Sequence, residues 1–346
     1  MSGHDIIVVG SSAGGMGALS DLIKGLPADL PAAIFVVRHI SAHSKNALPD
    51  ILNRRGELSA VEPRDGERIR HGVIYVAPPD LHMLIRRGYI HFARGPRENR
   101  LRPAIDPLFR TAAVSYGSRV VGVVLSGTLD DGTAGLMAVK RRGGIAVVQD
   151  PDDALHSGMP RSAIENVEVD YILPASAMAP VLVKLAAEPV EEGVDQPVDD
   201  EMQQEADIAE LDFAALRIGD KPGHPSRFSC PECQGVLWEI DDENIVRFRC
   251  RVGHAYSPET LLAEQGDQVE VAIWAGLRAL EENAALISRM AKRMREKGNE
   301  KVATRFDERA GDAIRRAETL RQMILGGKSL TIPELGMTAP ESERRA

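Results

Sequence analysis

The sequence predicts an α/β protein with a mostly parallel, doubly wound sheet, followed by a small zinc-ribbon-like segment and a helical C-terminal region. Short apolar runs rich in β-branched residues alternate with helical patterns from residue 5 to about residue 187. Fully apolar strands that alternate with helices are typical of a parallel sheet covered on both faces. Three cysteines and a histidine then lie close together, and apolar residues recur at helical spacing further on.

Strands and helices alternate in the first part of the chain. The strand patterns are DIIVVG, AAIFVVRHI, GVIYVAPP, RVVGVVLSG and IAVVQD, and the helical patterns cover about 15–24, 45–54, 106–117 and 133–144. HMLIRRGYIHFAR predicts a strand and a hairpin between them. In the third helix Asp106 is expected to be the N-cap, with Pro107 in the first turn.

The composition divides the chain into five regions. Residues 188–212 hold eleven acidic residues and no Lys or Arg, which predicts a solvated, flexible linker. Ser257, Pro258 and Glu259 have the residue types of a helix start. The expected regions are an α/β domain at 1–187, an acidic linker at 188–226, a Cys/His segment at 227–258, a helical region at 259–327 and a disordered tail at 328–346.

Two helices are expected within the helical region, at about 268–297 and 299–325. An apolar stripe at three- and four-residue spacing predicts that they pair as a hairpin or bind a partner. The stripe consists of Val269, Ile273, Leu277, Leu280, Ala284 and Ile287.

The charge and the apolar content exclude several classes of protein. The formal net charge is -9, and the excess of acidic residues lies in the C-terminal part. Nucleic acid is therefore not an expected ligand. No apolar run approaches the length of a membrane span, so no membrane insertion is expected. The N-terminus lacks the basic region of a signal peptide, which predicts a cytoplasmic protein.

The stretch VVGSSAGGMGAL, residues 8–19, lies between the first strand and the first helix. The dinucleotide fingerprint G-x-G-x-x-G does not fit, because Ser12 stands where the second glycine must be. A P-loop does not fit, because Met16 follows Gly15 and no Lys is near. Residues 10–14 instead match G-x-S-x-G, in the strand-to-helix context of a nucleophilic serine. Small residues also fill such turns for packing alone, so the pattern by itself leaves both interpretations open.

A nucleophilic serine needs a base and an orienting acid. His39 ends the second strand, and Asp130 and Asp131 follow the later strand VVGVVLSG. Ligand sites of parallel sheets lie at the carboxyl ends of the strands. We therefore predict a catalytic triad of Ser12, His39 and one of the two aspartates. The backbone N–H of Ala13, at the helix start, is an expected oxyanion donor, and Thr128 offers a second.

Residues 5 to about 187 resemble the catalytic domain of the chemotaxis protein-glutamate methylesterase family. The matching blocks run in the family's order and are VVGSSAGG, VVRHI, YVAPPDLHML, RPAIDPLFRTAA, VVLSGTLDDGTAGL, and GMPRSAI followed by VDYILP. The resemblance places the nucleophile at Ser12, the histidine at His39 and the aspartate at Asp131, which precedes Gly132 in the family's D-G pattern.

The resemblance also implies an activity and a partner. It implies hydrolysis of glutamate γ-methyl esters on methyl-accepting chemoreceptors or related signalling proteins, with glutamine deamidation as a second reaction and no cofactor for catalysis. The family's turn commonly reads S-T-G-G, whereas this chain has Ser12-Ala13-Gly14-Gly15, which changes the oxyanion side. Members often carry a receiver domain before the esterase. Here the esterase pattern begins at residue 5, so receiver-based control is not expected in this chain.

The cysteines lie in a pattern typical of metal ligands. Cys230-x2-Cys233 is followed after 16 residues by Cys250-x3-His254. Two close pairs of this kind predict a structural tetrahedral zinc site. The alternatives are unrelated small buried residues and a redox CxxC, but no thioredoxin-like strand and helix surround the motif. The segment is similar to a C-terminal extension of some stand-alone methylesterase-like proteins.

Two other functions stay open at this point. The esterase fold could be a catalytically weak or inactive scaffold that binds a signalling partner through the zinc segment and the helices. A general small-ester hydrolase also fits the serine turn. The other histidines show no partner pattern and are expected to be surface or packing residues; they include His71, His82, His91 and His156.

Overall fold

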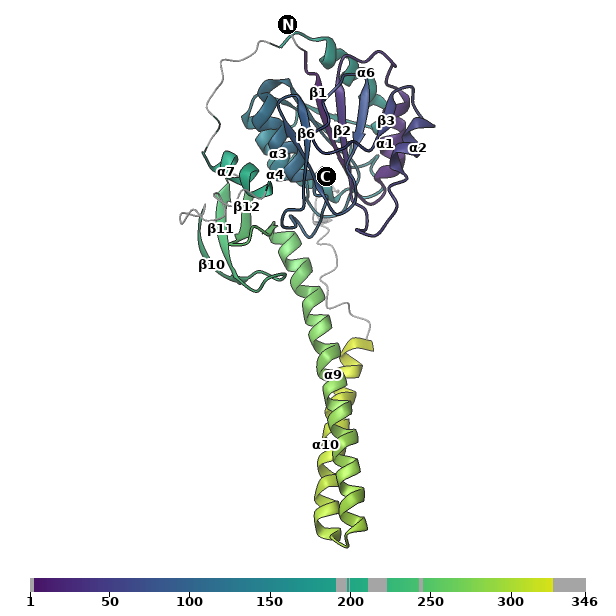
Figure 1. The fold of residues 1–346 in the computed structure, drawn as a ribbon, viewed down its shortest axis with the longest axis vertical. Coiled ribbons are helices and arrows are strands. Elements are labelled where there is room, and N and C mark those ends of the chain that lie inside the picture. Colours follow the sequence, from purple (N-terminus) through teal and green to yellow (C-terminus); the bar gives the residue numbers. More distant parts are fainter. Residues whose placement is uncertain (1–2, 191–197, 199, 211–222, 243–244, 326–346) are drawn as a thin grey trace, which may run out of the picture. The chain divides into compact units, whose positions relative to one another are not determined.

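The computed structural model describes residues 3–190, 198, 200–210, 223–242 and 245–325. A seven-stranded parallel sheet lies at the centre of the first part, in the order β3-β4-β2-β1-β7-β8-β9 (Figure 1). The expected parallel α/β fold is confirmed. The strands are β1 Ile6–Ser11, β2 Ala33–Arg38, β3 Ser59–Val61, β4 Val73–Val76, β7 Val120–Val124, β8 Ile145–Gln149 and β9 Tyr171–Leu173.

Helices cover both faces of this sheet. On one face lie α1 Gly15–Lys24, α2 Leu48–Asn53 and α6 Ala175–Ala187. On the other lie α3 Ile105–Tyr116, α4 Thr133–Arg141 and α5 Gly158–Asn166. Successive side chains of β1 point to opposite faces, so Ile7 and Val9 enter one core and Ile6 and Val8 the other. Burial on both faces explains why the strands are continuous apolar runs.

The predicted hairpin packs beside α3. It consists of β5 His82–Arg86 and β6 Tyr89–Ala93, which pair antiparallel. A short 3₁₀ helix, Gly117–Arg119, joins α3 to β7.

β1 lies where the order of the strands reverses. It pairs with β2 on one side and with β7 on the other, and Gly10 is in register with both Val37 and Val124. The three segments that follow β1, β2 and β7 therefore leave the sheet at one edge. In doubly wound sheets, ligands bind in the crevice at such a switch point.

Asp106 is not the N-cap of its helix, contrary to our expectation. The helix begins at Ile105, after an extended Ala104, so Asp106 lies in the first turn. Its Oδ1 accepts the N–H groups of Gly132 and Gly135 at 3.0 and 2.7 Å. The carboxylate therefore satisfies N-terminal donors of α4 instead of its own helix.

A second, small sheet follows in the chain. Its strands are β10 His224–Ser229, β11 Val236–Asp242, β12 Ile245–Cys250 and β13 Ala255–Tyr256, all antiparallel. This sheet, together with the turns between its strands, is called the ribbon below. It confirms the expected small segment that carries the Cys/His cluster.

A helix lies within the segment that we expected to be a solvated linker. It is α7, Asp200–Ala209, and it packs on α3. Met202 and Ile208 are buried, and the Glu205 side chain is 6% exposed because it pairs with arginines of other elements. The acidic composition of the segment does not indicate that this one acid is buried, because its partners lie far away in the sequence. Residues 191–197, 199 and 211–222 of that segment, and the expected tail at 328–346, lie outside the described residues.

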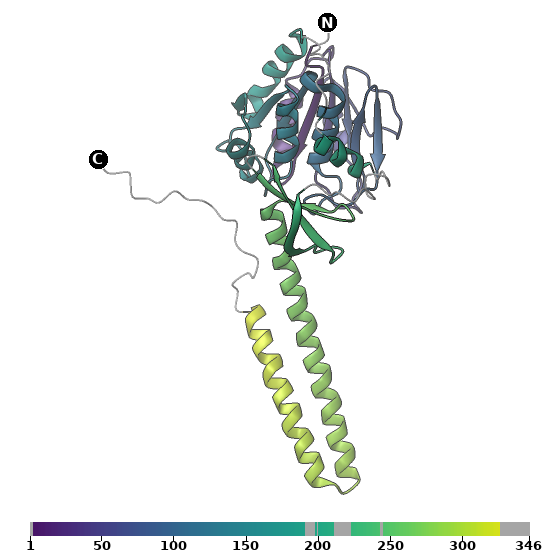
Figure 2. The same cartoon turned by 90° about the vertical axis from the view of Figure 1, so that its left-hand side faces the viewer.

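α9 Pro258–Glu296 and α10 Glu300–Leu325 run side by side as a helical hairpin (Figure 2). α9 begins directly after Ser257, as the sequence predicts. Within the described residues, the hairpin from Leu261 onward forms a compact unit of its own. Val269, from the predicted stripe, is 49% exposed. Several buried positions recur at seven-residue intervals, as in coiled coils: Leu277, Ala284 and Ala291 in α9, and Ala303, Ala310 and Ala317 in α10, where Ala313 is buried as well.

None of the helices in the described part of the chain combines the length and the apolar composition that crossing a bilayer requires.

Candidate active site

The turn after β1 places two adjacent serines in different surroundings. Ser11 is fully buried, and its hydroxyl has no hydrogen-bond partner in the described part of the chain. Ser12 is partly exposed, and its N–H donates to the Ser126 carbonyl at 2.9 Å. Of the two, only Ser12 is accessible to a substrate from solution.

Gly14 makes this turn tight. It has a φ of 73°, in the left-handed region, and it is the N-cap of α1. A Cβ at this position would lie 2.7 Å from Leu155 Cβ and 2.8 Å from Ser126 Oγ. The residue must therefore be glycine on both conformational and steric grounds.

The side chains of His39 and Asp131 meet at the carboxyl ends of β2 and β7. His39 Nε2 lies 2.7 Å from Asp131 Oδ2, and the two side chains are 9% and 2% exposed. The His39 N–H donates to the Ser11 carbonyl at 3.1 Å, which ties the histidine backbone to the serine turn. Within the described residues, the Ser12 hydroxyl makes no hydrogen bond to the His39 ring.

Other donors also surround the Asp131 carboxylate. Oδ2 accepts the Ile105 N–H at 2.7 Å, and Oδ1 accepts the Asn99 amide at 3.0 Å and the Asp106 N–H at 3.3 Å. Burial raises the pKa of Asp131, but hydrogen bonding and charge from His39, followed by the Ile105 and Asn99 donors, lower it overall. Asp131 is therefore an anion at neutral pH, and His39 Nε2 carries the proton that it accepts.

The other two carboxyl groups at this edge have raised pKa values. Burial, and then the charge of Asp131, raises the pKa of Asp106 well above its ordinary value. Burial, and then the charge of Glu259, raises the pKa of Asp130 to about 7. Asp130 accepts a hydrogen bond from the Ser257 hydroxyl at 2.9 Å. Of the two aspartates that the spacing left open, Asp131 is the one that contacts His39.

The two expected oxyanion donors lie on loops that flank Ser12. The Ser126 hydroxyl donates to the Ala13 carbonyl at 2.8 Å, which joins the loops. Both Ala13 and Thr128 are partly exposed. Neither N–H has a hydrogen-bond acceptor in the ranges that the structure describes.

A cavity of about 250 Å³ lies beside this edge, between the sheet domain and the ribbon. Asp106, Asp130, Ser162 and Ser257 are among the residues that line it. Ser12 and His39 are not among them. An ester placed for attack by Ser12 would therefore bind outside this cavity, on the open side of the turn.

The predicted metal ligands converge in the ribbon. Their four ligand atoms lie within 4.8 Å of one another. Cys250 Sγ lies 3.6 Å from Cys233 Sγ and 3.5 Å from His254 Nδ1. Tetrahedral zinc, with bonds of about 2.3 Å to sulfur and 2.0–2.1 Å to nitrogen, needs ligand atoms at such separations. His254 Nε2 lies 3.3 Å from Glu232 Oε2, the outer carboxylate contact that ligating histidines commonly make. The cluster thus fits a metal ion.

The fold and the site together define a class of protein. It is an α/β protein in which the switch point of a parallel sheet carries an accessible serine and a buried His–Asp pair, the residue types of a hydrolase.

Comparison with known proteins identifies a family within this class. Residues 7–182 match the CheB methylesterase family, and the chain belongs to that family. A protein of Leptospira interrogans is 40% identical over 183 residues, which is 53% of this chain and 95% of the relative. An Archaeoglobus fulgidus protein-glutamate methylesterase/protein-glutamine glutaminase is 35% identical over 182 residues, which is 51% of this chain and 52% of that protein. The chain therefore spans about half the length of the Archaeoglobus relative.

A solved structure agrees with the sequence matches. The crystal structure of the Thermotoga maritima CheB methylesterase catalytic domain is similar with a TM-score of 0.51 and 36% identity, covering 54% of this chain and 100% of that one. The predicted resemblance is thus confirmed for the sheet domain. The family match ends at residue 182, so α7, the ribbon and the helical hairpin lie outside it.

Reasoning from the sequence missed Asn99 and the role of Asp106. Asn99 lies in ENR, three residues with no strand or helix pattern, and its backbone has a φ of 50°. The available signal is weak: asparagine is one of the few residues that tolerate a left-handed conformation in turns. The expected surface or packing role of His82 does fit its surroundings, because it is fully buried and its Nε2 lies 2.9 Å from the Pro96 carbonyl.

Proposed function

We propose that this protein is a serine esterase that hydrolyses glutamate γ-methyl esters on the cytoplasmic helices of methyl-accepting chemoreceptors or related signalling proteins. The observation that carries the proposal is the buried His39–Asp131 pair together with the partly exposed Ser12, in a chain of the CheB methylesterase family. The Archaeoglobus relative is named for both methylesterase and glutaminase activity. The proposal therefore includes deamidation of receptor glutamine.

The first half of the reaction acylates Ser12. Asp131 holds the Nε2–H tautomer of His39, so Nδ1 is the basic nitrogen that takes the proton from the serine hydroxyl. The serine oxygen attacks the ester carbonyl, and the N–H groups of Ala13 and Thr128 stabilise the negative oxygen that develops. The intermediate collapses to an acyl-enzyme, and methanol leaves with the proton from His39.

The second half releases glutamate. His39 takes a proton from water, and the resulting nucleophile attacks the acyl carbonyl. The second tetrahedral intermediate collapses, Ser12 recovers its proton from His39, and the γ-carboxylate leaves. For a glutamine side chain the same steps release ammonia in place of methanol.

The surroundings of the turn suit a protein substrate. Leu155 is 76% exposed, and a Cβ on Gly14 would lie 2.7 Å from its Cβ, so this apolar side chain stands at the edge of the serine turn. His156, next to it, is also exposed. Leu155 at the edge of the serine turn thus offers a contact for the apolar stripe of a receptor helix.

We further propose that Cys230, Cys233, Cys250 and His254 hold a structural zinc ion. The metal would tie together the two turns of the ribbon and has no part in ester hydrolysis. All four positions are taken by protein side chains, as in structural sites, whereas catalytic sites keep an open position.

Methanol release from a methylated chemoreceptor tests the esterase proposal. The Ser12→Ala variant should lose activity by a factor of about 10³ or more. Ser11→Ala is the matched control, because it removes a buried neighbouring hydroxyl without touching the exposed one, and it should retain activity. Equal methanol release by the wild type and Ser12→Ala would contradict the proposal.

Two further outcomes separate the alternatives. Hydrolysis of p-nitrophenyl acetate without release of methanol from any receptor would favour a general small-ester hydrolase. No hydrolysis of either substrate by folded protein would favour a binding scaffold. Either result would overturn the proposed activity.

A further inference from the structure

The ribbon and the sheet domain share a short piece of β-pairing next to Asp131. The Ala255 N–H donates to the Arg97 carbonyl at 3.2 Å, and the Asn99 N–H donates to the Ala255 carbonyl at 2.9 Å. Ala255 begins β13 and directly follows His254 of the Cys/His cluster. The loop before α3 is thus paired with a ribbon strand.

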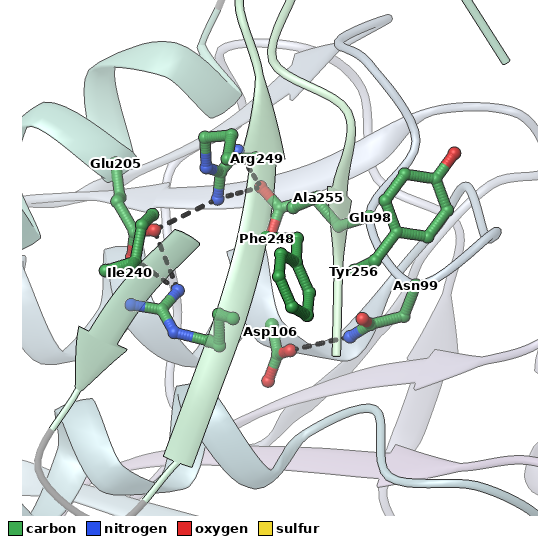
Figure 3. A pocket seen from close by; sticks show the side chains of 10 residues that line it. Glu98, Asn99, Asp106, Glu205, Ile240, Phe248, Arg249, Ala255 and Tyr256 are labelled. Carbon is green, nitrogen blue, oxygen red and sulfur yellow. Dashed lines mark hydrogen bonds and ion pairs between the residues drawn. The ribbon is translucent and has the colours of Figure 1, made fainter. Parts of the chain in front are cut away.

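The side chain of Asn99 connects the start of α9, directly after the ribbon, to the proposed catalytic aspartate. Its amide donates to Asp131 Oδ1 at 3.0 Å and to Asp106 Oδ2 at 2.8 Å (Figure 3 shows the second contact). Its carbonyl oxygen accepts the Ser257 N–H at 3.2 Å and the Thr260 hydroxyl at 3.3 Å. Both of the amide's polar ends are therefore engaged: the nitrogen with the sheet domain, and the oxygen with the start of α9.

The backbone here depends on tertiary contacts. Asn99 and Arg100 have φ values of 50° and 72°, so two consecutive non-glycine residues are left-handed. Such conformations persist only where the surrounding structure holds them. The pairing with Ala255 supplies one such restraint.

Buried ion pairs supply a second restraint. Glu98, directly before Asn99, pairs with Arg110 of α3 at 2.7 Å and with Arg249 of β12 at 3.3 Å. Glu205 of α7 pairs with Arg249 at 3.2 Å (Figure 3). These side chains are between 3% and 6% exposed. The cavity among them measures only about 10 Å³, so this interface is closely packed.

We infer that the ribbon is a positioning device for the esterase site, and that Asn99 is the positioning residue through which it holds the Asp131 carboxylate toward His39. The inference rests on the proposed function and goes beyond it, because the ribbon lies outside the part of the chain that matches the family.

Asn99 also separates two carboxyl groups. Its amide nitrogen donates to both Asp106 and Asp131, which would otherwise face each other in a buried place. The charge of Asp131 also interacts with His39, with Asp130 and, from the β5 side, with His82. The charge of Arg110 interacts with Asp106. Loss of the amide therefore removes a donor that stabilises the Asp131 anion, and the active form should need a higher pH.

Labelling with a fluorophosphonate probe tests the inference in the full chain. The Ser12 oxygen forms a bond to phosphorus, fluoride leaves, and the serine proton passes to His39, so the rate reports activation of the serine without a receptor. Asn99→Ala should label about 10-fold more slowly or worse, with the acid limb of the rate moved up by roughly half a pH unit or more.

Two more variants sharpen the test. Thr260→Val removes one donor to the Asn99 oxygen and should shift the rate and the acid limb in the same direction by less, so it serves if Asn99→Ala does not fold. Arg141→Ala is the matched control: it removes the ion pair between α4 and Asp242 of the ribbon but leaves Asn99 untouched. It should label like the wild type.

The outcomes are distinct. The inference alone would be overturned if folded Asn99→Ala were labelled at the wild-type rate and with the wild-type pH midpoint. It would also be overturned if Arg141→Ala were labelled as slowly as Asn99→Ala. Wild-type protein that is not labelled at Ser12 would overturn the proposed function and the inference together. Slowing and a shifted acid limb confined to the Asn99 and Thr260 variants would support the positioning role.

Discussion

Asp131 Oδ2 lies 2.7 Å from His39 Nε2, although 92 residues separate them in the chain. The contact exists because β1 pairs with both β2 and β7, which brings the ends of those two strands to either side of the serine turn. The carboxylate is held by backbone and side-chain donors as well, so its orientation is set before any substrate binds. Preorganised charge of this kind is what ester hydrolysis requires.

Substitutions at Asp131 and at its neighbour Asp130 should have different effects on kcat. Asp131→Asn keeps the shape but loses the charge that fixes the His39 tautomer, so kcat should fall by about 10³- to 10⁴-fold. Asp130→Asn is the control, because Asp130 contacts Ser257 and not His39, and it should leave kcat near the wild-type value. The measurement is methanol release from methylated receptor. A larger loss in Asp130→Asn would reassign the acid.

Gly127 should tolerate no side chain. A Cβ there would lie 2.0 Å from Met159 Sδ and 2.9 Å from Ser12 Cβ. Gly127→Ala should therefore displace Ser12, abolish ester hydrolysis and lower the free energy of unfolding by about 1–3 kcal/mol. Urea unfolding and the methanol assay check both effects.

Gly17 supplies the control for that prediction. It lies in α1, and a Cβ there meets nothing within 4 Å. Gly17→Ala should raise the free energy of unfolding by about 0.4–1 kcal/mol and keep the activity. Full activity in Gly127→Ala would show that the serine turn is not packed as described.

Zinc content should follow the Cys/His cluster. Purified protein should contain one zinc per chain, and Cys250→Ser should lose it together with thermal stability of the ribbon, because metal binding and folding are coupled in small sites. His224→Ala, which removes an exposed histidine of β10, should keep the metal. Elemental analysis and thermal unfolding with and without a chelator measure this. Folded, metal-free wild-type protein would contradict the zinc proposal.

Because of the ion pairs of Glu205, the free energy of unfolding should depend on pH and should fall when this residue is replaced. Burial opposes ionisation, but the charges of Arg247, Arg110 and Arg249 lower the pKa of Glu205 well below its ordinary 4.5. Its contribution is therefore complete above about pH 4.5 and is lost as the pH falls toward the lowered value. Glu205→Gln leaves arginines without their counter-charge and should destabilise residues 1–260 by about 3–5 kcal/mol at pH 7.

A matched variant on the same helix controls for the loss of charge. Glu201 is exposed on α7, and Glu201→Gln should change the free energy of unfolding by less than about 0.5 kcal/mol. Urea unfolding at pH 7 and pH 4 measures both variants. A destabilisation of Glu205→Gln that does not shrink at the lower pH would contradict the electrostatic explanation.

Much of the fold could be predicted from local patterns. Apolar runs such as residues 6–9 predict strands buried on both faces, and the structure confirms them. The pattern of Cys230, Cys233, Cys250 and His254 predicts a cluster, and the four ligand atoms converge. Asp106 and α7 were misjudged because their polar side chains find partners that are distant in the sequence. A propensity or a composition carries no information about such partners.

The sequence by itself determined which chemical groups this protein possesses: a serine in a glycine-rich turn, a histidine and two aspartates at strand ends, and a Cys/His cluster of four side chains that could hold a metal ion. The tertiary structure decided which aspartate contacts His39, which serine is partly exposed, and that Asn99, whose backbone pairs with Ala255, links Asp131 to the ribbon. The physical reason is the distance along the chain over which each kind of interaction acts. Periodicity and turn preferences act over a few residues, whereas hydrogen bonds and buried ion pairs form between segments that only the packed chain brings together.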